Sequence, residues 1–399
     1  MSDPRWPVVW ILGAGQCVYW GILYYAFSVL LVPMRDEWGT SDAAIAGAFS
    51  AGLAVNAVLA TAVGRWLDRG RGVALLRGGA LAGAGLLLAW SWVDSLAGLY
   101  AVWTGLGACM ALVLYETAFA LITRAYGDPA TRLRALASVT VVGGLASTLF
   151  LPLVGAGVAH LGWRLTLRVL VVVWLLATVW LERAALPGLH ASDRRTRPTS
   201  ASAPAGDPVD RRLLWWSGAP FVAATFAAMA LTTLVVPSLV ARGHSIDQAA
   251  WALAALGVMQ LPGRVWLWRG GGRAVSPRGL LVAPMALQVV GLALLGTSGS
   301  LAGAFSGVAI FGIGAGLHTL VRPWIVPLLF GTDAAGRTNG IIARAQGIAR
   351  AAGPFAVAAA SGWIGSDAVF LALSLALLAC CPLAYALSRH PSLLAHSAA

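Results

Sequence analysis

Two charged residues lie inside apolar stretches, where a charge is unusual. Glu116 lies in the stretch VLYETAF and Arg322 in HTLVRPW. A charge at the centre of a bilayer costs about 3 kcal/mol on insertion scales, so such residues are usually paired, face a cavity and take part in function. An arginine binds anions, and a glutamate binds a proton or pairs with a cation. The two residues predict anion binding and proton coupling, with a permanent salt bridge as the structural alternative.

The same two residues suggest how coupling would work. While it is paired with Arg322, Glu116 stays ionised. If a substrate draws the arginine away, the desolvated carboxyl group binds a proton more readily. That exchange couples the movement of a proton to the movement of a solute. Replacement of Glu116 by glutamine is then expected to abolish pH-driven uptake.

Other polar residues lie in the same or neighbouring apolar stretches. His318 precedes Arg322 by four residues, so both lie on one helix face. His318 is a candidate for proton transfer, or else a hydrogen-bonded structural residue. Arg350 is a further candidate for the inner half of a cavity. A mostly apolar pocket with a few polar contacts has these further candidates: Gln16, Tyr24, Tyr25 and Tyr115.

The elements that carry these residues are apolar helices. Of the 399 residues, 59% are hydrophobic and 11% are charged, whereas soluble proteins have about 25% charged residues. A helix needs about 20 apolar residues to cross a bilayer, and runs of this length recur along the chain. The turn-forming stretch GTSGS at 296–300 divides a longer run into two crossings. We predict an all-α membrane protein with twelve transmembrane helices.

The basic residues mark membrane topology and do not indicate nucleic-acid binding. All 27 are arginines and the net charge is +12, and most of them fall in alternate loops, as the positive-inside rule requires. We therefore predict a multi-pass protein of a bacterial inner membrane with both termini in the cytoplasm. The first apolar run is too long for a signal-peptide core, so we expect it to be retained. The expected partners are the lipid bilayer, a small solute and, as an open alternative, protons, with the monomer as the functional unit.

Residues for other kinds of chemistry are not grouped in the sequence. We find no paired carboxylates, histidine cluster or nucleophile constellation near a membrane face. The four cysteines all lie in apolar stretches, where cysteine behaves as a small hydrophobic residue, so they indicate no disulfide or metal framework. We expect no enzyme activity, no cofactor and no metal.

The chain consists of two halves that repeat at an offset of about 200 residues. LVPMRDEWGTS leads into the second span, and VVPSLVARGHS does the same in the second half. Ser41 and Ser245 are placed to cap the helices that follow. Between the halves, a segment rich in proline, serine and arginine is typical of a flexible linker. The predicted division is 1–182, 183–212 and 213–399, and two parallel six-helix repeats are the arrangement of major facilitator transporters.

The sequence GRWLDRGRG at 64–72 resembles the loop motif of the major facilitator superfamily, which has Gly, three residues, Asp, Arg, then Gly and a basic residue, and Gly70 comes one residue earlier here than in that pattern. The resemblance implies that this loop braces the two halves on the cytoplasmic side. Asp68 would then contact the start of helix eleven or a nearby arginine. The alternative is a set of ordinary positive-inside arginines at a helix end. The residues implicated are Gly64, Asp68, Arg69, Gly70, Arg71, Arg337 and Arg344.

A narrower resemblance covers much of the first half. YYAFSVLLVPMRDEWGTSDAAIAGAFS, RLRALASVTVVGG and the GWR at 162–164 resemble the monocarboxylate and oxalate-type branch of the same superfamily. The resemblance implies an organic anion as cargo, and helices one, four, seven and ten as the lining of a central cavity. The alternatives are a proton-antiport exporter of a hydrophobic drug or secondary metabolite, which an aromatic cavity would suit, and a sensor that does not transport.

Overall fold

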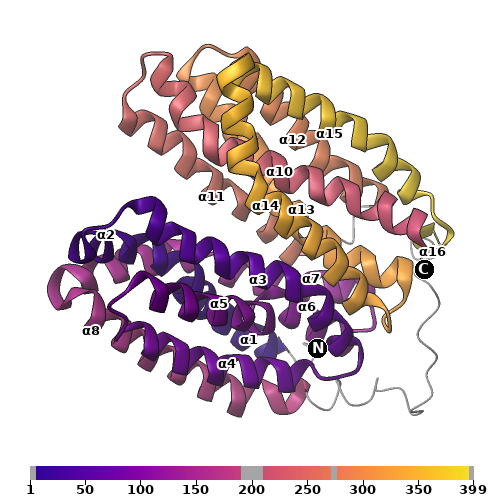
Figure 1. Cartoon of the computed structure of the whole chain (residues 1–399). Coiled ribbons are helices and arrows are strands. Elements are labelled where there is room, and N and C mark those ends of the chain that lie inside the picture. The colour runs from indigo at the N-terminus through magenta and orange to yellow at the C-terminus, as the bar shows by residue number, and fades with distance from the viewer. Residues whose placement is uncertain (1–5, 190–209, 271–275, 395–399) are drawn as a thin grey trace. The chain divides into compact units, whose positions relative to one another are not determined.

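The computed structural model describes residues 6–189, 210–270 and 276–394, and its regular elements are helices (Figure 1). The first half contains α1 (Trp6–Trp20), the π-helical segment η1 (Gly21–Tyr25), α2 (Ala26–Trp38), α3 (Asp42–Asp68), α4 (Gly72–Trp90), α5 (Leu96–Val113), α6 (Tyr115–Ala125), α7 (Pro129–Gly143) and α8 (Ala146–Ala184). The second half contains α10 (Arg211–Ala241), α11 (Ile246–Trp268), α12 (Pro277–Thr297), α13 (Leu301–Phe330), α14 (Ala335–Ile364), α15 (Ser366–Ser388) and α16 (Pro391–Leu394).

These helices correspond to twelve crossings. Within the described residues, nine spans are long and apolar enough to cross a membrane. One of them, Pro129–Ala184, has 56 residues, far more than the about 20 that one crossing needs. The backbone of Gly162 leaves the helical region within it (φ 75°, ψ 163°), so this span is two crossings. The remaining two are α11 with 23 residues and α14 with 30, both of sufficient length.

Serine caps define several helix starts. The side chain of Ser41 accepts a backbone N–H at the start of α3. At the start of α11, Ser245 and Gln248 form a complete capping box, in which each side chain bonds the backbone of the other residue. Ser300 caps α13 just after α12 has ended. The predicted caps and the predicted division at 296–300 are confirmed.

The chain forms two compact units that are not simply its two halves. Unit 1 comprises Met1–Ala203 and Thr332–Arg344, and unit 2 comprises Pro204–Gly331 and Ala345–Ala399. The first part of α14 therefore belongs to unit 1, although it follows α13 in sequence. Much of the predicted linker, 190–209, lies outside the described residues, and the predicted domain boundaries stay a prediction.

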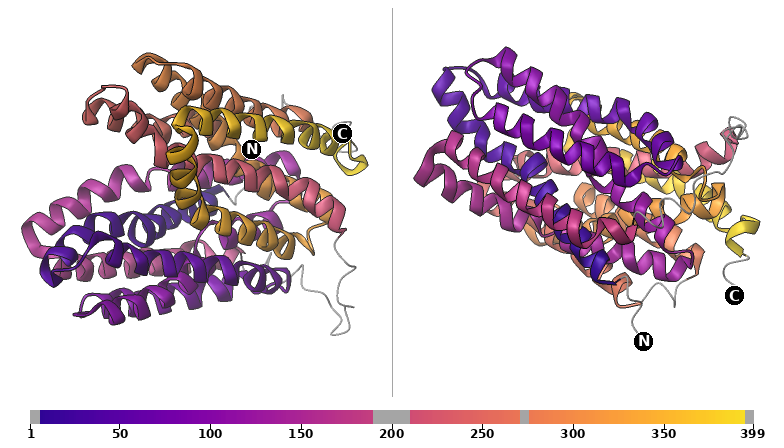
Figure 2. Two further views of the ribbon diagram at one scale, coloured as in Figure 1. Left: turned by 45° about the horizontal axis from the view of Figure 1, so that its top comes forward. Right: turned by 90° about the horizontal axis from the view of Figure 1, so that it is seen from below.

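Three crossings of unit 1 are irregular. The first contains the π-helical segment η1, the fourth is broken between α5 and α6, and the fifth is broken between α7 and α8. The break in the fourth crossing is at Leu114, which has an extended conformation (φ −77°, ψ −168°). In both views of Figure 2, the helices α1 to α8, coloured indigo to magenta, run side by side. In unit 2, α10 and α13 continue through their internal prolines without a break.

Candidate functional site

The first, second and fourth crossings of unit 1 contribute to a group of aromatic side chains, the aromatic cluster, which consists of Trp20, Tyr24, Tyr25, Phe49 and Tyr115. The ring of Trp20 lies 5.3 Å from that of Tyr24 and 5.1 Å from that of Tyr115. Tyr24 lies 5.3 Å from Tyr25 and 5.4 Å from Phe49. All five side chains are half-buried. The structure thus brings together the three tyrosines that the sequence singled out.

The π-helical segment η1 carries two of these tyrosines. Single-turn π-helical segments inside α-helices are frequent at functional sites. Gly21 begins the segment, and a side chain there would overlap the ring of Phe150 in α8. The close approach of α8 leaves room only for glycine at this point. Neither the segment nor this contact has a local sequence signal, because both depend on how α1 and α8 pack.

The fourth crossing brings Glu116 next to the aromatic cluster. Glu116 is half-buried and lies in the first turn of α6, directly after Tyr115. On the other side of the break, the carbonyl oxygen of Val113 accepts a hydrogen bond from Nε2 of Gln16 at 2.7 Å. Gln16 is fully buried. The predicted residues Gln16, Tyr115 and Glu116 therefore lie together at one interruption.

Unit 2 contains a buried polar group on α13. His318 and Arg322 lie one turn apart and are 7% and 8% exposed. Nδ1 of His318 lies 3.0 Å from Nε2 of Gln288 in α12. An amide nitrogen is a donor, so Nδ1 is the acceptor and a neutral ring carries its proton on Nε2. The ring also packs on Phe221 of α10, with the ring centroids 4.6 Å apart.

Two glutamines extend this group, and sequence reasoning missed both. Gln288 anchors the histidine and also donates to the carbonyl of Pro284 at 3.1 Å. Gln346 of α14 donates to Oγ1 of Thr225 at 2.7 Å and to the carbonyl of Phe221 at 3.2 Å. An amide inside an apolar helix was the available signal, since such groups need partners in a membrane.

Arg350 and the predicted pair of Glu116 with Arg322 are the remaining candidates. Arg350 lies in α14 within unit 2 and is half-buried. Glu116 and Arg322 belong to different units, so a pair between them stays a prediction.

The loop motif forms a contact inside unit 1. Asp68 is the last residue of α3. Its Oδ1 accepts the backbone N–H of Gly336 and its Oδ2 that of Arg337, each at 2.6 Å. A carboxylate at this place bonds donors that a helix start leaves without intrahelical partners, and it opposes the positive end of the helix dipole. The predicted contact with the start of helix eleven is present, through backbone amides. Its role in gating stays a prediction.

Glycines allow α3 to approach the start of α14. A side chain at Gly64 would overlap the carbonyl of Gly336, and one at Gly340 would overlap the backbone of Ala60. Oγ1 of Thr61 donates to the carbonyl of Gly340 at 3.3 Å. The other motif residues surround this contact: Gly70 has a positive φ of 69°, Arg337 is half-buried, and Arg69, Arg71 and Arg344 are exposed.

Comparison with known proteins identifies the family. The model of the Major Facilitator Superfamily matches residues 12–354. The chain belongs to this superfamily. The predicted resemblance and the all-α, twelve-helix fold are thereby confirmed, and the protein is a multi-pass membrane transporter.

Individual relatives are more distant. The chain is 28% identical over 262 residues to the Oxalate:formate antiporter of Oxalobacter formigenes. The match covers 62% of this chain and 58% of the relative, less than two thirds of its length. The crystal structure of the human organic anion transporter MFSD10 (TETRAN) has a TM-score of 0.71 at 17% identity and covers 96% of this chain and 100% of that one. FucP in the outward conformation has a TM-score of 0.62 at 14% identity, with 95% and 97% covered. These two likenesses concern the fold.

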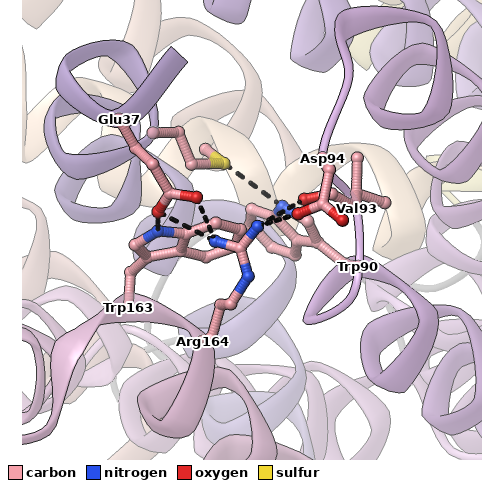
Figure 3. Close-up of polar contacts among 7 residues, drawn as sticks. Glu37, Trp90, Val93, Asp94, Trp163 and Arg164 are labelled. Carbon is pink, nitrogen blue, oxygen red and sulfur yellow. Dashed lines mark hydrogen bonds and ion pairs between the residues drawn. The ribbon is translucent and has the colours of Figure 1, made fainter.

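This major facilitator protein also has a polar cluster around its GWR segment, the Arg164 cluster (Figure 3). The carboxylate of Glu37 accepts the indole N–H of Trp163 at 2.6 Å and Nη1 of Arg164 at 2.6 and 2.8 Å. Nη2 of Arg164 donates to the carbonyl of Val93 at 3.1 Å and pairs with Asp94. The cluster joins the end of α2, the connection after α4 and the kink in α8. It holds these three segments of unit 1 together.

Proposed function

We propose that this transporter moves a small organic anion, such as a monocarboxylate, by alternating access. The observation that carries the proposal is Arg322, a cation that is 8% exposed within an apolar helix. A desolvated guanidinium group binds a carboxylate through paired N–H donors and favours a planar anion over a neutral solute. His318 lies one turn from Arg322 on the same helix and is bonded to Gln288. It adds a second polar group beside Arg322.

Unit 1 has its own candidates for contact with the solute. The aromatic cluster provides apolar walls, which suit the hydrocarbon part of a small solute. Glu116 at the start of α6 is the proposed proton-binding or pairing partner. The name of the curated relative, an oxalate and formate exchanger, supports an organic anion as cargo. The arginine distribution supports a bacterial inner membrane with both termini in the cytoplasm, and we propose that the monomer is sufficient.

A second candidate function is export of a hydrophobic drug or secondary metabolite in exchange for protons. The half-buried rings of the aromatic cluster favour it, because aromatic faces bind apolar and cationic compounds well. In this case, Glu116 rather than Arg322 would be the principal charge of the site.

Thermal stabilisation of the purified protein separates the two candidates. Oxalate, formate, acetate and lactate are compared with a panel of hydrophobic cations at two pH values. A ligand at about 100 times its Kd stabilises the folded state by about 2.7 kcal/mol. We expect a carboxylate to raise the Tm of the wild type and of Arg278→Ala, an exposed control in unit 2, and to have no effect on Arg322→Ala. Stabilisation by hydrophobic cations alone would favour the exporter.

A further inference from the structure

The break in the fourth crossing is held by a side chain of the first crossing. Nε2 of Gln16 donates to the carbonyl of Val113, the last residue of α5, at 2.7 Å. Gln16 is 0% exposed, so this bond is made without competition from solvent. A buried carbonyl at a helix end requires a partner, and inside a membrane no water is at hand to supply one.

Gln16 acts at this position as a hydrogen-bond donor. Within the described residues, its Oε1 has no hydrogen-bond partner, whereas its Nε2 bonds Val113. Beyond the break, the chain continues through Leu114, whose carbonyl accepts the N–H of Thr117 at 3.2 Å and so begins α6. The fourth crossing thus restarts at Tyr115, two residues after Val113, whose carbonyl bonds Gln16.

The restart determines where Tyr115 and Glu116 lie. Tyr115 is held from two sides: its ring is 5.1 Å from that of Trp20, and a side chain at Gly143 would overlap its hydroxyl group. Closure of the break into a continuous helix would rotate both residues about the axis of the crossing. Neither contact would then survive unchanged.

Unit 2, in which the corresponding crossing is not broken, supports a connection between Gln16 and the break. At the offset that pairs Pro33 with Pro237, the counterpart of Gln16 is Pro220, whose side chain has no donor. The corresponding crossing of unit 2, α13, runs without a break from Leu301 to Phe330. The broken crossing and the amide donor at this position occur together in the first half, and neither occurs at the corresponding place in the second half.

We propose that Gln16 is a positioning residue that keeps the fourth crossing open at Leu114 and thereby orients Tyr115 and Glu116 for the solute. The part that concerns the solute rests on the proposed function. The part that concerns the open break does not.

Transport kinetics test the part that concerns the solute. Exchange of oxalate against formate is measured in proteoliposomes for the wild type, Gln16→Met, Gln16→Glu and Thr178→Val. Thr178 is a matched control, because its buried bond to the hydroxyl of Tyr19 joins the first crossing to α8 away from the break. We expect Gln16→Met to raise the KM about tenfold, equivalent to about 1.4 kcal/mol, and Thr178→Val to leave it within about twofold.

The glutamate variant gives a readout that a loss of packing would not give. A neutral carboxyl group still donates one O–H, whereas an ionised one only accepts. The activity of Gln16→Glu relative to the wild type is therefore expected to be high at low pH and to fall as the pH rises. Gln16→Met has no donor at any pH, so its relative activity stays low throughout.

Crosslinking tests the open break without any substrate. Trp20→Cys and Tyr115→Cys are combined with replacement of Cys17, Cys109, Cys380 and Cys381 by alanine, and the pair is bridged with a short bis-maleimide reagent. We expect Gln16→Met to lower the crosslinking yield and Thr178→Val to preserve it. If the wild type exchanges neither probe, the proposed function fails for these anions, and crosslinking still decides the question of the break. Equal yields and equal KM values for Gln16→Met and Thr178→Val would overturn the inference.

Discussion

The charged residues Asp68, Arg322 and Glu116 differ in their surroundings. Asp68 has both carboxylate oxygens bonded to backbone N–H groups of α14, which suits a fixed structural contact. Arg322 and Glu116 lie in apolar crossings, where a charge is retained mainly for function. Sequence reasoning found Arg322 and Glu116 because a charge in an apolar run is visible locally, and it found Asp68 because this residue is part of the loop motif. It missed Gln288 and Gln346, whose importance comes from partners in other helices.

Glu116 carries a prediction at this scale. Glutamine keeps the size of the side chain but cannot bind a proton at these pH values. We expect Glu116→Gln to abolish uptake driven by a pH gradient, measured in proteoliposomes with an acidic exterior. Glu182→Gln, which changes a carboxylate in a partly exposed pair with Arg77, serves as the control. Unchanged pH-driven uptake by Glu116→Gln would remove this residue from coupling.

Whole elements were predictable where their signals are local. Apolar runs, serine caps and the turn at 296–300 gave the crossings and several of their starts. The break at Leu114 and the π-helical segment η1 were not predictable, since the irregularity depends on partners such as Gln16, 97 residues away from Val113. The same limit applies to the approach of α3 to α14, where the motif glycine was recognised but its partner Gly336 was not.

Gly64 carries the prediction for the elements. A side chain there overlaps the carbonyl of Gly336, and overpacking of this kind costs about 1–3 kcal/mol. We expect Gly64→Ala to lower the Tm and to reduce transport. Gly85→Ala in α4 is the control, because nothing lies within 4 Å of the added carbon and alanine favours a helix over glycine by about 1 kcal/mol. A Tm of Gly64→Ala as high as that of Gly85→Ala would contradict the close contact.

Both halves of the molecule contain an ion pair at corresponding places, and the positions of the acidic and the basic residue are exchanged between the halves. In unit 1, Glu37 at the end of α2 meets Arg164 after the kink at Gly162 (φ 75°). In unit 2, Arg242 after α10 meets Asp367, which follows Gly365 (φ 84°). The offset of about 200 residues predicted the repeat, but not the exchange of charges. It also did not predict that Thr332–Arg344 belongs to unit 1, because that grouping follows from the contacts of α3.

Transport of an organic anion through Arg322 is the central claim, and a flux measurement tests it most directly. Labelled oxalate is exchanged against formate in proteoliposomes that contain the wild type, Arg322→Ala or Arg278→Ala. We expect saturable exchange by the wild type and Arg278→Ala, and loss of exchange in Arg322→Ala. Exchange by Arg322→Ala at the rate of the wild type would contradict it.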